Sequence, residues 1–272
     1  MPTVERFTGL GRPIDLRYSS NRYVAALTVV ATAIGFAIGG VAGAVAIGGA
    51  CFLGWATARE LDPDHPLSAA IAGGVAGALA WMTGEQGAPV SLGTVYLLMA
   101  AARVLARTTG RWPTRIDLAL HAGAAAWLST GPHAWVAALT LAVAVVRDTR
   151  MSVPAPAENL LWGAAIGLFS AGMAAVSARP VVWAAPEPNM LALVVAGAVG
   201  LAVMATDRTV GSVTDSGKHP LDPSRVVAGR IVVGVGATVI ALIGGRAGIG
   251  AVTPIWLALA TTAAVRLARG IR

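Results

Sequence analysis

Long apolar stretches separated by short polar loops dominate the chain. Ten of them approach the roughly 17–25 residues that an α-helix needs to cross a membrane. Within each stretch the residues are apolar on all sides, whereas strands facing a polar lumen would alternate polar and apolar residues. We therefore predict an all-α, polytopic transmembrane bundle of about ten spans, at residues 23–39, 42–58, 67–83, 91–106, 116–129, 134–146, 159–177, 189–205, 224–244 and 251–267.

Two of these stretches, the fifth and the sixth, are short for complete crossings. Residues 116–147 must contain both, so a re-entrant pair that stops partway is the alternative for this region. Elsewhere the glycine pairs Gly39-Gly40 and Gly244-Gly245 predict tight turns between neighbouring helices. Residues 1–22 are polar and predict a cytoplasmic N-terminal segment, which precedes a single transmembrane bundle over residues 23–272.

Positive charge is distributed unevenly over the loops. When the loops are assigned alternately to two sides, 18 of the 20 Lys and Arg residues fall on the side of the N-terminus, and only Arg179 and Arg246 fall on the other. Cytoplasmic loops of membrane proteins carry the excess of Lys and Arg. The asymmetry predicts that both termini are cytoplasmic.

The composition excludes an ordinary soluble domain. Apolar residues make up 56% of the chain and charged residues 12%, whereas soluble domains carry about 25% charged residues. The net charge of +7 is explained by the cytoplasmic loops, so no nucleic-acid partner is expected. The single cysteine, Cys51, lies in an apolar stretch and has no cysteine partner for a disulfide or a metal site.

Every second predicted helix ends in an arginine after small or apolar residues. Arg59, Arg103 and Arg147 follow one another at intervals of 44 residues, and Arg208 and Arg266 end two later helices. The spacing indicates tandem two-helix repeats. The alternative is that each arginine only anchors its helix at the cytoplasmic surface. If these helix ends converge, the arginines form a ring that attracts anionic lipid headgroups.

The densest polar cluster is the loop that runs from Arg59 to Pro66. Asp62, Asp64 and His65 are ligand types that Mg²⁺ or Mn²⁺ accepts, and a metal held by carboxylates suits an enzyme acting on a lipid phosphate. Asp before Pro is also ordinary turn chemistry, and Ser or Asp before a helix is an ordinary cap. We favour the structural interpretation and keep the three residues as metal candidates.

Ionisable residues near the ends of the apolar segments are the remaining candidates. Asp117 and His121 are four residues apart and share one helix face, and such groups at membrane depth are often functional. We therefore place a candidate binding site between the inward helix ends, at Arg59, Arg103, Asp117, His121 and Arg147.

The predicted function is that of an integral protein of the inner (plasma) membrane, a transporter or channel-like component. One alternative is a non-catalytic membrane subunit or scaffold of a larger complex. Another is an enzyme that acts on a lipid-linked phosphate at the cytoplasmic face, so the question of catalysis stays open. Membrane lipids, further copies of the chain or other membrane subunits are the expected partners, and no cofactor is expected. The richness in Ala, Gly, Val and Arg is typical of GC-rich bacteria.

Overall fold

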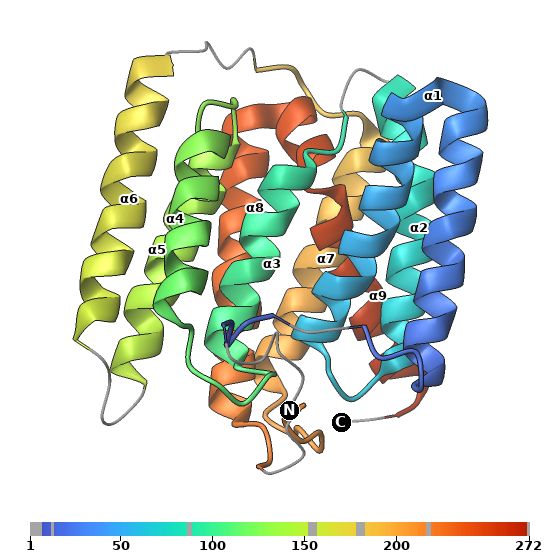
Figure 1. The fold of residues 1–272 in the computed structure, drawn as a ribbon. Helices are drawn as coiled ribbons and strands as arrows, with labels where there is room; N and C mark the ends of the chain where they lie inside the picture. Colours follow the sequence, from blue (N-terminus) through green and yellow to red (C-terminus); the bar gives the residue numbers. More distant parts are fainter. Residues whose placement is uncertain are drawn as a thin grey trace.

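The structure is a computed structural model that describes residues 7–11, 14–85, 89–151, 157–177, 183–215 and 219–270. These residues form an upright bundle of nine helices (Figure 1), so the all-α prediction is confirmed. The helices are α1 (Ser19–Leu61), α2 (Pro66–Glu85), α3 (Leu92–Ala106), α4 (Arg115–Leu128), α5 (Ala134–Arg150), α6 (Glu158–Ser177), α7 (Pro188–Thr206), α8 (Pro223–Ala251) and α9 (Thr253–Ala268).

The prediction of about ten spans is wrong. In the described part of the chain, five helices are long and apolar enough to cross a membrane: α1, α2, α6, α7 and α8. The other four have 15, 14, 17 and 16 residues. At about 1.5 Å per residue they measure roughly 21–26 Å, which is less than the hydrocarbon thickness of about 30 Å. The chain is therefore a candidate multi-pass membrane protein with five such helices.

The longest helix, α1, folds back on itself. Its 43 residues break at Gly39 and at Gly40, which has φ 60° and ψ −147°, a conformation that glycine adopts without steric cost. Beyond the break the two arms touch, because a side chain at Gly35 would collide with the backbone of Gly43. Figure 1 shows these antiparallel arms, and α8 breaks in the same way at Gly245. Both breaks fall in the glycine pairs that predicted tight turns.

The centre of the bundle is formed by α3 and α9. Helix α3 packs against α1, α5 and α8, and α9 packs against α1, α2 and α7. Small residues allow these close approaches, since a Cβ at Gly197 would lie 2.6 Å from the Trp256 ring. Helix α6 lies at the edge, where it packs against α4 and α5 (Figure 1).

A glycine on α7 allows the closest approach to α9. A Cβ on Gly200 would collide with the carbonyl group of Leu259, so we expect Gly200→Ala to force the helices apart and cost about 1–3 kcal/mol. The control is Gly172→Ala on α6, where a Cβ meets nothing within 4 Å and alanine is the better helix former by about 1 kcal/mol. Unfolding in detergent with added SDS measures both. Equal stabilities of the two variants would contradict this packing.

The first helix begins and the last helix ends at the same end of the bundle. The start of α1 and the end of α9 are at the same end of the molecule (Figure 1), which we call the terminal end. Helices α1, α3, α5, α7 and α9 also finish there, and the turn from α4 to α5 lies at the opposite end. The predicted charge positions Arg6, Arg12, Arg179, Lys218 and Arg272 lie outside the described residues.

Candidate functional site

Asp62 and His65, two of the three residues predicted to bind a metal, lie in the loop that follows α1. The Asp62 side chain is fully buried. Its carboxylate accepts hydrogen bonds from Nε and Nη2 of Arg266, at 3.1 and 2.8 Å, and lies 2.9 Å from Nδ1 of His65. Arg266, 1% exposed, also pairs with Asp207 beyond α7. Asp62 thus ties the end of α1 to α9.

Asp64 points to a different part of the chain. Its carboxylate accepts hydrogen bonds from the backbone amides of Gly211 and Ser212, at 2.9 and 2.8 Å. Partial burial favours the protonated form, but the bonds from Ser212 and Gly211 outweigh it and hold the pKa of Asp64 below its ordinary value. Among the described residues no group of three or more His, Cys, Asp and Glu side chains is arranged to hold a metal. The contacts of Asp62 and Asp64 are those of a structural loop.

The low pKa of Asp64 has a consequence for acid stability. Because the folded state prefers the ionised carboxylate, its contribution is complete above the ordinary pKa of about 4 and is lost as the pH falls through the lower folded value. We expect Asp64→Asn to lower the unfolding midpoint at pH 7 and to reduce its loss on acidification below pH 4. The exposed Asp15 provides the control variant, Asp15→Asn. Parallel pH profiles for wild type and Asp64→Asn would contradict this role.

The predicted arginines differ in their partners and in their exposure. Arg103 pairs with the buried Glu60 at 2.6 Å, and Glu60 also accepts a hydrogen bond from Thr108 at 2.6 Å. Arg59 donates to the carbonyl oxygen of Pro63 at 3.2 Å, whereas Arg147 is exposed. Arg59, Arg103 and Arg147 do lie in the last turns of α1, α3 and α5. Their different surroundings leave the tandem repeat a prediction.

A second buried ion cluster joins α5 to α8. Asp148, 1% exposed, accepts hydrogen bonds from Arg225 at 2.7 and 2.9 Å and from Arg107 at 2.8 and 2.9 Å. The guanidinium of Arg107 also lies 3.3 Å from the centre of the Trp112 ring, a cation–π contact. Together with the Glu60 and Asp62 pairs, this cluster forms what we call the ion-pair layer of the terminal end.

Asp117 and His121 turn to different partners. Asp117 closes a capping box with Thr114 at the start of α4 and also accepts the backbone amide of Gly9 at 2.7 Å, so it fastens the N-terminal segment. His121 Nδ1 lies 2.6 Å from the carbonyl oxygen of Asp117, and the ring stacks on Tyr96 with 5.7 Å between ring centres. The binding site predicted around these two residues stays a prediction.

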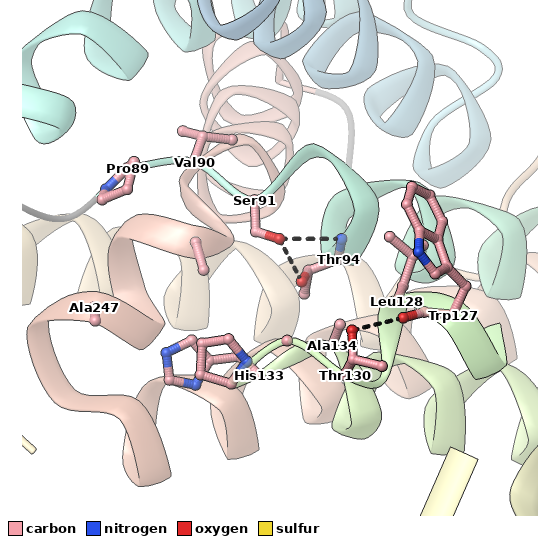
Figure 2. Close-up of a pocket in the computed structure, with 13 residues that line it drawn as sticks. Pro89, Val90, Ser91, Thr94, Trp127, Leu128, Thr130, His133, Ala134 and Ala247 are labelled. Carbon is pink, nitrogen blue, oxygen red and sulfur yellow. Dashed lines mark hydrogen bonds between the residues drawn. The ribbon is translucent and has the colours of Figure 1, made fainter. Parts of the chain in front are cut away.

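A cavity of about 390 Å³ lies at the opposite end, and none of the predicted site residues lines it. Figure 2 shows its lining, which comes from the start of α3, the turn between α4 and α5, and the end of α8. The hydroxyl groups of Ser91 and Thr94 lie 2.7 Å apart in its wall. Apolar surface comes from Val90 and Leu128. A volume of this size suits a small ligand.

His133 is the notable side chain of this cavity. It is 6% exposed, and its Nδ1 has no hydrogen-bond partner. Burial lowers the pKa of the His133 ring below its ordinary value, because burial disfavours the charged form. The ring packs over Gly244, where a Cβ would lie 2.6 Å from it. No spacing pattern in the sequence links His133 to Ser91 or Thr94.

Comparison with known proteins does not assign the chain to a family. No family model, no curated protein and no solved structure matches this chain.

Proposed function

We propose that the chain is a transporter or channel-like component of the inner membrane, with its termini in the cytoplasm. The observation that supports this proposal is that the two ends of the bundle differ. A cavity of about 390 Å³ opens at the opposite end, while buried ion pairs fill the terminal end. This is the arrangement expected of a carrier that is open to one side and closed to the other.

The orientation is supported by the charge distribution. The terminal end carries the exposed arginines Arg147, Arg150, Arg208 and Arg269, and the excess of Lys and Arg marks the cytoplasmic side. The cavity then faces outward. A solute that entered it would reach the cytoplasm only after the ion-pair layer had parted.

Within that layer, the Asp62–Arg266 pair is the best target for a mutation that tests whether the terminal end can open. It links α1 to α9, one of the two central helices. Charges at this depth separate only if each finds another partner or water. Weakening the pair should therefore favour a state in which the terminal end is open and the cavity is closed.

Cysteine accessibility tests this proposal without background, because the only native cysteine, Cys51, is buried and can be replaced by alanine. Reporter cysteines replace Thr130, which lines the cavity, and Thr262, which is fully buried one turn before Arg266. In intact cells we expect an impermeant maleimide to label Thr130→Cys. Thr262→Cys should stay protected even in inverted membrane vesicles.

The decisive step adds Asp62→Asn or the milder Arg266→Lys. We expect labelling of Thr262→Cys in inverted vesicles to rise and outside labelling of Thr130→Cys to fall. Glu158→Gln is the control, since the Arg115–Glu158 pair is exposed. Gel filtration in detergent verifies that each variant is folded. Unchanged labelling of both reporters in folded variants would overturn the carrier proposal, and labelling of Thr130→Cys only in inverted vesicles would overturn the orientation.

A membrane subunit of a larger complex is the second candidate, and it is favoured by α6. Leu161, Leu168 and Val176 on this edge helix are 73, 76 and 83% exposed. Lipid covers such a face equally well, so the purified size decides. Co-purification of a stoichiometric membrane partner, lost when Leu168 and Val176 are replaced by serine, would favour the subunit over the carrier.

A further inference from the structure

A second, smaller pocket lies at the terminal end, between α1 and α3. Its volume is about 80 Å³, several times the roughly 10–15 Å³ that one buried water needs. Because α1 folds back at Gly40, this helix lines the pocket twice, with Asn21 from its start and Arg59 from its last turn. Helix α3 contributes Met99 and Arg103. The pocket therefore joins three helical segments that are far apart in the sequence.

Two guanidinium groups share this pocket. Arg59 and Arg103 lie in the last turns of α1 and α3, and the protein fixes both of them. Arg59 donates to the carbonyl oxygen of Pro63, and Arg103 pairs with Glu60 while its side chain stays 19% exposed. None of the eight described residues that line the pocket is Asp or Glu. A guanidinium carries five N–H groups in a planar fork, so it can serve a protein acceptor and a phosphate together.

The wall of the pocket becomes apolar with distance from the helix ends. On α1, Trp55 lies one turn before Arg59, and on α3, Met99 lies one turn before Arg103. Phe52 lies about 10 Å before Arg59 along α1, and its ring is 5.8 Å from that of Trp55 between centres. The pocket thus passes from guanidinium groups at the bundle end to aromatic and aliphatic side chains deeper along the helices.

We propose that this pocket binds the phosphate of an anionic glycerophospholipid from the membrane leaflet at the terminal end. The phosphodiester oxygens accept hydrogen bonds from Arg59 and Arg103, and an acyl chain packs along Trp55 and Phe52. A lipid with an ammonium headgroup fits less well, because its positive charge would lie beside two guanidinium groups and no lining carboxylate would receive it. This inference goes beyond the carrier proposal and needs only that the chain lies in a membrane.

The test compares dioleoyl phosphatidylglycerol with dioleoyl phosphatidylcholine and with glycerophosphoglycerol, the same phosphodiester without acyl chains. Each is titrated into the purified full-length protein in detergent, where native mass spectrometry counts the bound molecules and the unfolding midpoint reports their effect. We expect phosphatidylglycerol to bind and raise the midpoint, and the other two to bind at least tenfold more weakly. Arg59→Gln should weaken phosphatidylglycerol about tenfold, the loss of one hydrogen bond to a charged group.

The control variant is Arg147→Gln, because Arg147 lies in the last turn of α5 and does not line the pocket. It should leave lipid binding unchanged. An equal loss in Arg59→Gln and Arg147→Gln would mean that the lipid follows surface charge in general, and it would overturn the site. Phosphatidylcholine that binds as well as phosphatidylglycerol would overturn the anionic headgroup, and glycerophosphoglycerol that does so would overturn a lipid as the source of the phosphate.

A second variant keeps the proposal testable if Arg59→Gln does not fold. Phe52→Ala shortens the apolar wall and leaves both arginines in place, so it should weaken phosphatidylglycerol and leave the weak binding of glycerophosphoglycerol unchanged. Phosphatidylglycerol binding of wild-type strength in Phe52→Ala would overturn the proposed path of the acyl chain. None of these outcomes bears on the carrier proposal, which the reporter cysteines test separately.

Discussion

Replacing Asp148 by alanine is expected to destabilise the protein by about 3–5 kcal/mol, the cost of leaving a buried charge without its partner. Asp148 is the common acceptor for Arg107 at the end of α3 and Arg225 in the first turn of α8, and it is 1% exposed. The alanine variant leaves two guanidinium groups facing each other across a space that water does not readily fill. The loss should therefore exceed that of a single pair.

The measurement is the unfolding midpoint in detergent titrated with SDS, followed by tryptophan fluorescence. Asp148→Asn keeps the shape and one acceptor oxygen, so it should fall between alanine and wild type. Glu158→Ala removes a carboxylate from an arginine that is 77% exposed and should cost about 1 kcal/mol or less. A loss for Asp148→Ala as small as that for Glu158→Ala would mean that the cluster is solvated and contributes little.

The helices could be predicted well from the sequence, and the number of membrane-spanning ones could not. Apolar runs bounded by Gly, Pro and Asp located the helical segments, and the glycine pairs located the breaks in α1 and α8. The span count failed because apolarity alone does not distinguish a helix that faces lipid from a short helix buried by its neighbours. Helices α3 and α9 are of the second kind, with 15 and 16 residues and mostly buried side chains.

The ion pairs could be predicted only in part from the sequence. Glu60, Asp148 and Asp207 each stand beside an arginine, but only the three-dimensional packing assigns Arg103 to Glu60 and Arg266 to Asp62 and Asp207. The strongest missed signal was Arg230, which stands within an apolar helix, where an unpaired charge is costly. The cavity could not be predicted, because its walls come from three separate segments that carry no motif.

Arg230 is expected to be the single arginine on which the terminal end most depends. It is fully buried, and its Nε donates to the carbonyl oxygen of Leu61 at 2.7 Å, while Nη1 donates to those of Met204 and Asp207 at 2.8 and 3.0 Å. These carbonyls belong to the carboxyl ends of α1 and α7, which carry partial negative charge. One guanidinium on α8 thus caps two other helices.

We expect Arg230→Met to cost about 3 kcal/mol or more, because hydrogen bonds to a charged group contribute roughly 1.5–3 kcal/mol each and the freed carbonyls stay buried. Arg230→Lys keeps the charge but lacks the planar fork that reaches both helices, so it should recover only part of the loss. The control is Arg147→Met on the exposed face of α5, for which a change within about 0.5 kcal/mol is expected. If lysine restored full stability, charge alone would suffice and the two-helix cap would be wrong. If Arg230→Met and Arg147→Met changed the stability equally, the carbonyl groups at the ends of α1 and α7 would have other hydrogen-bond donors. Arg230 on α8 would then not hold these two helix ends together.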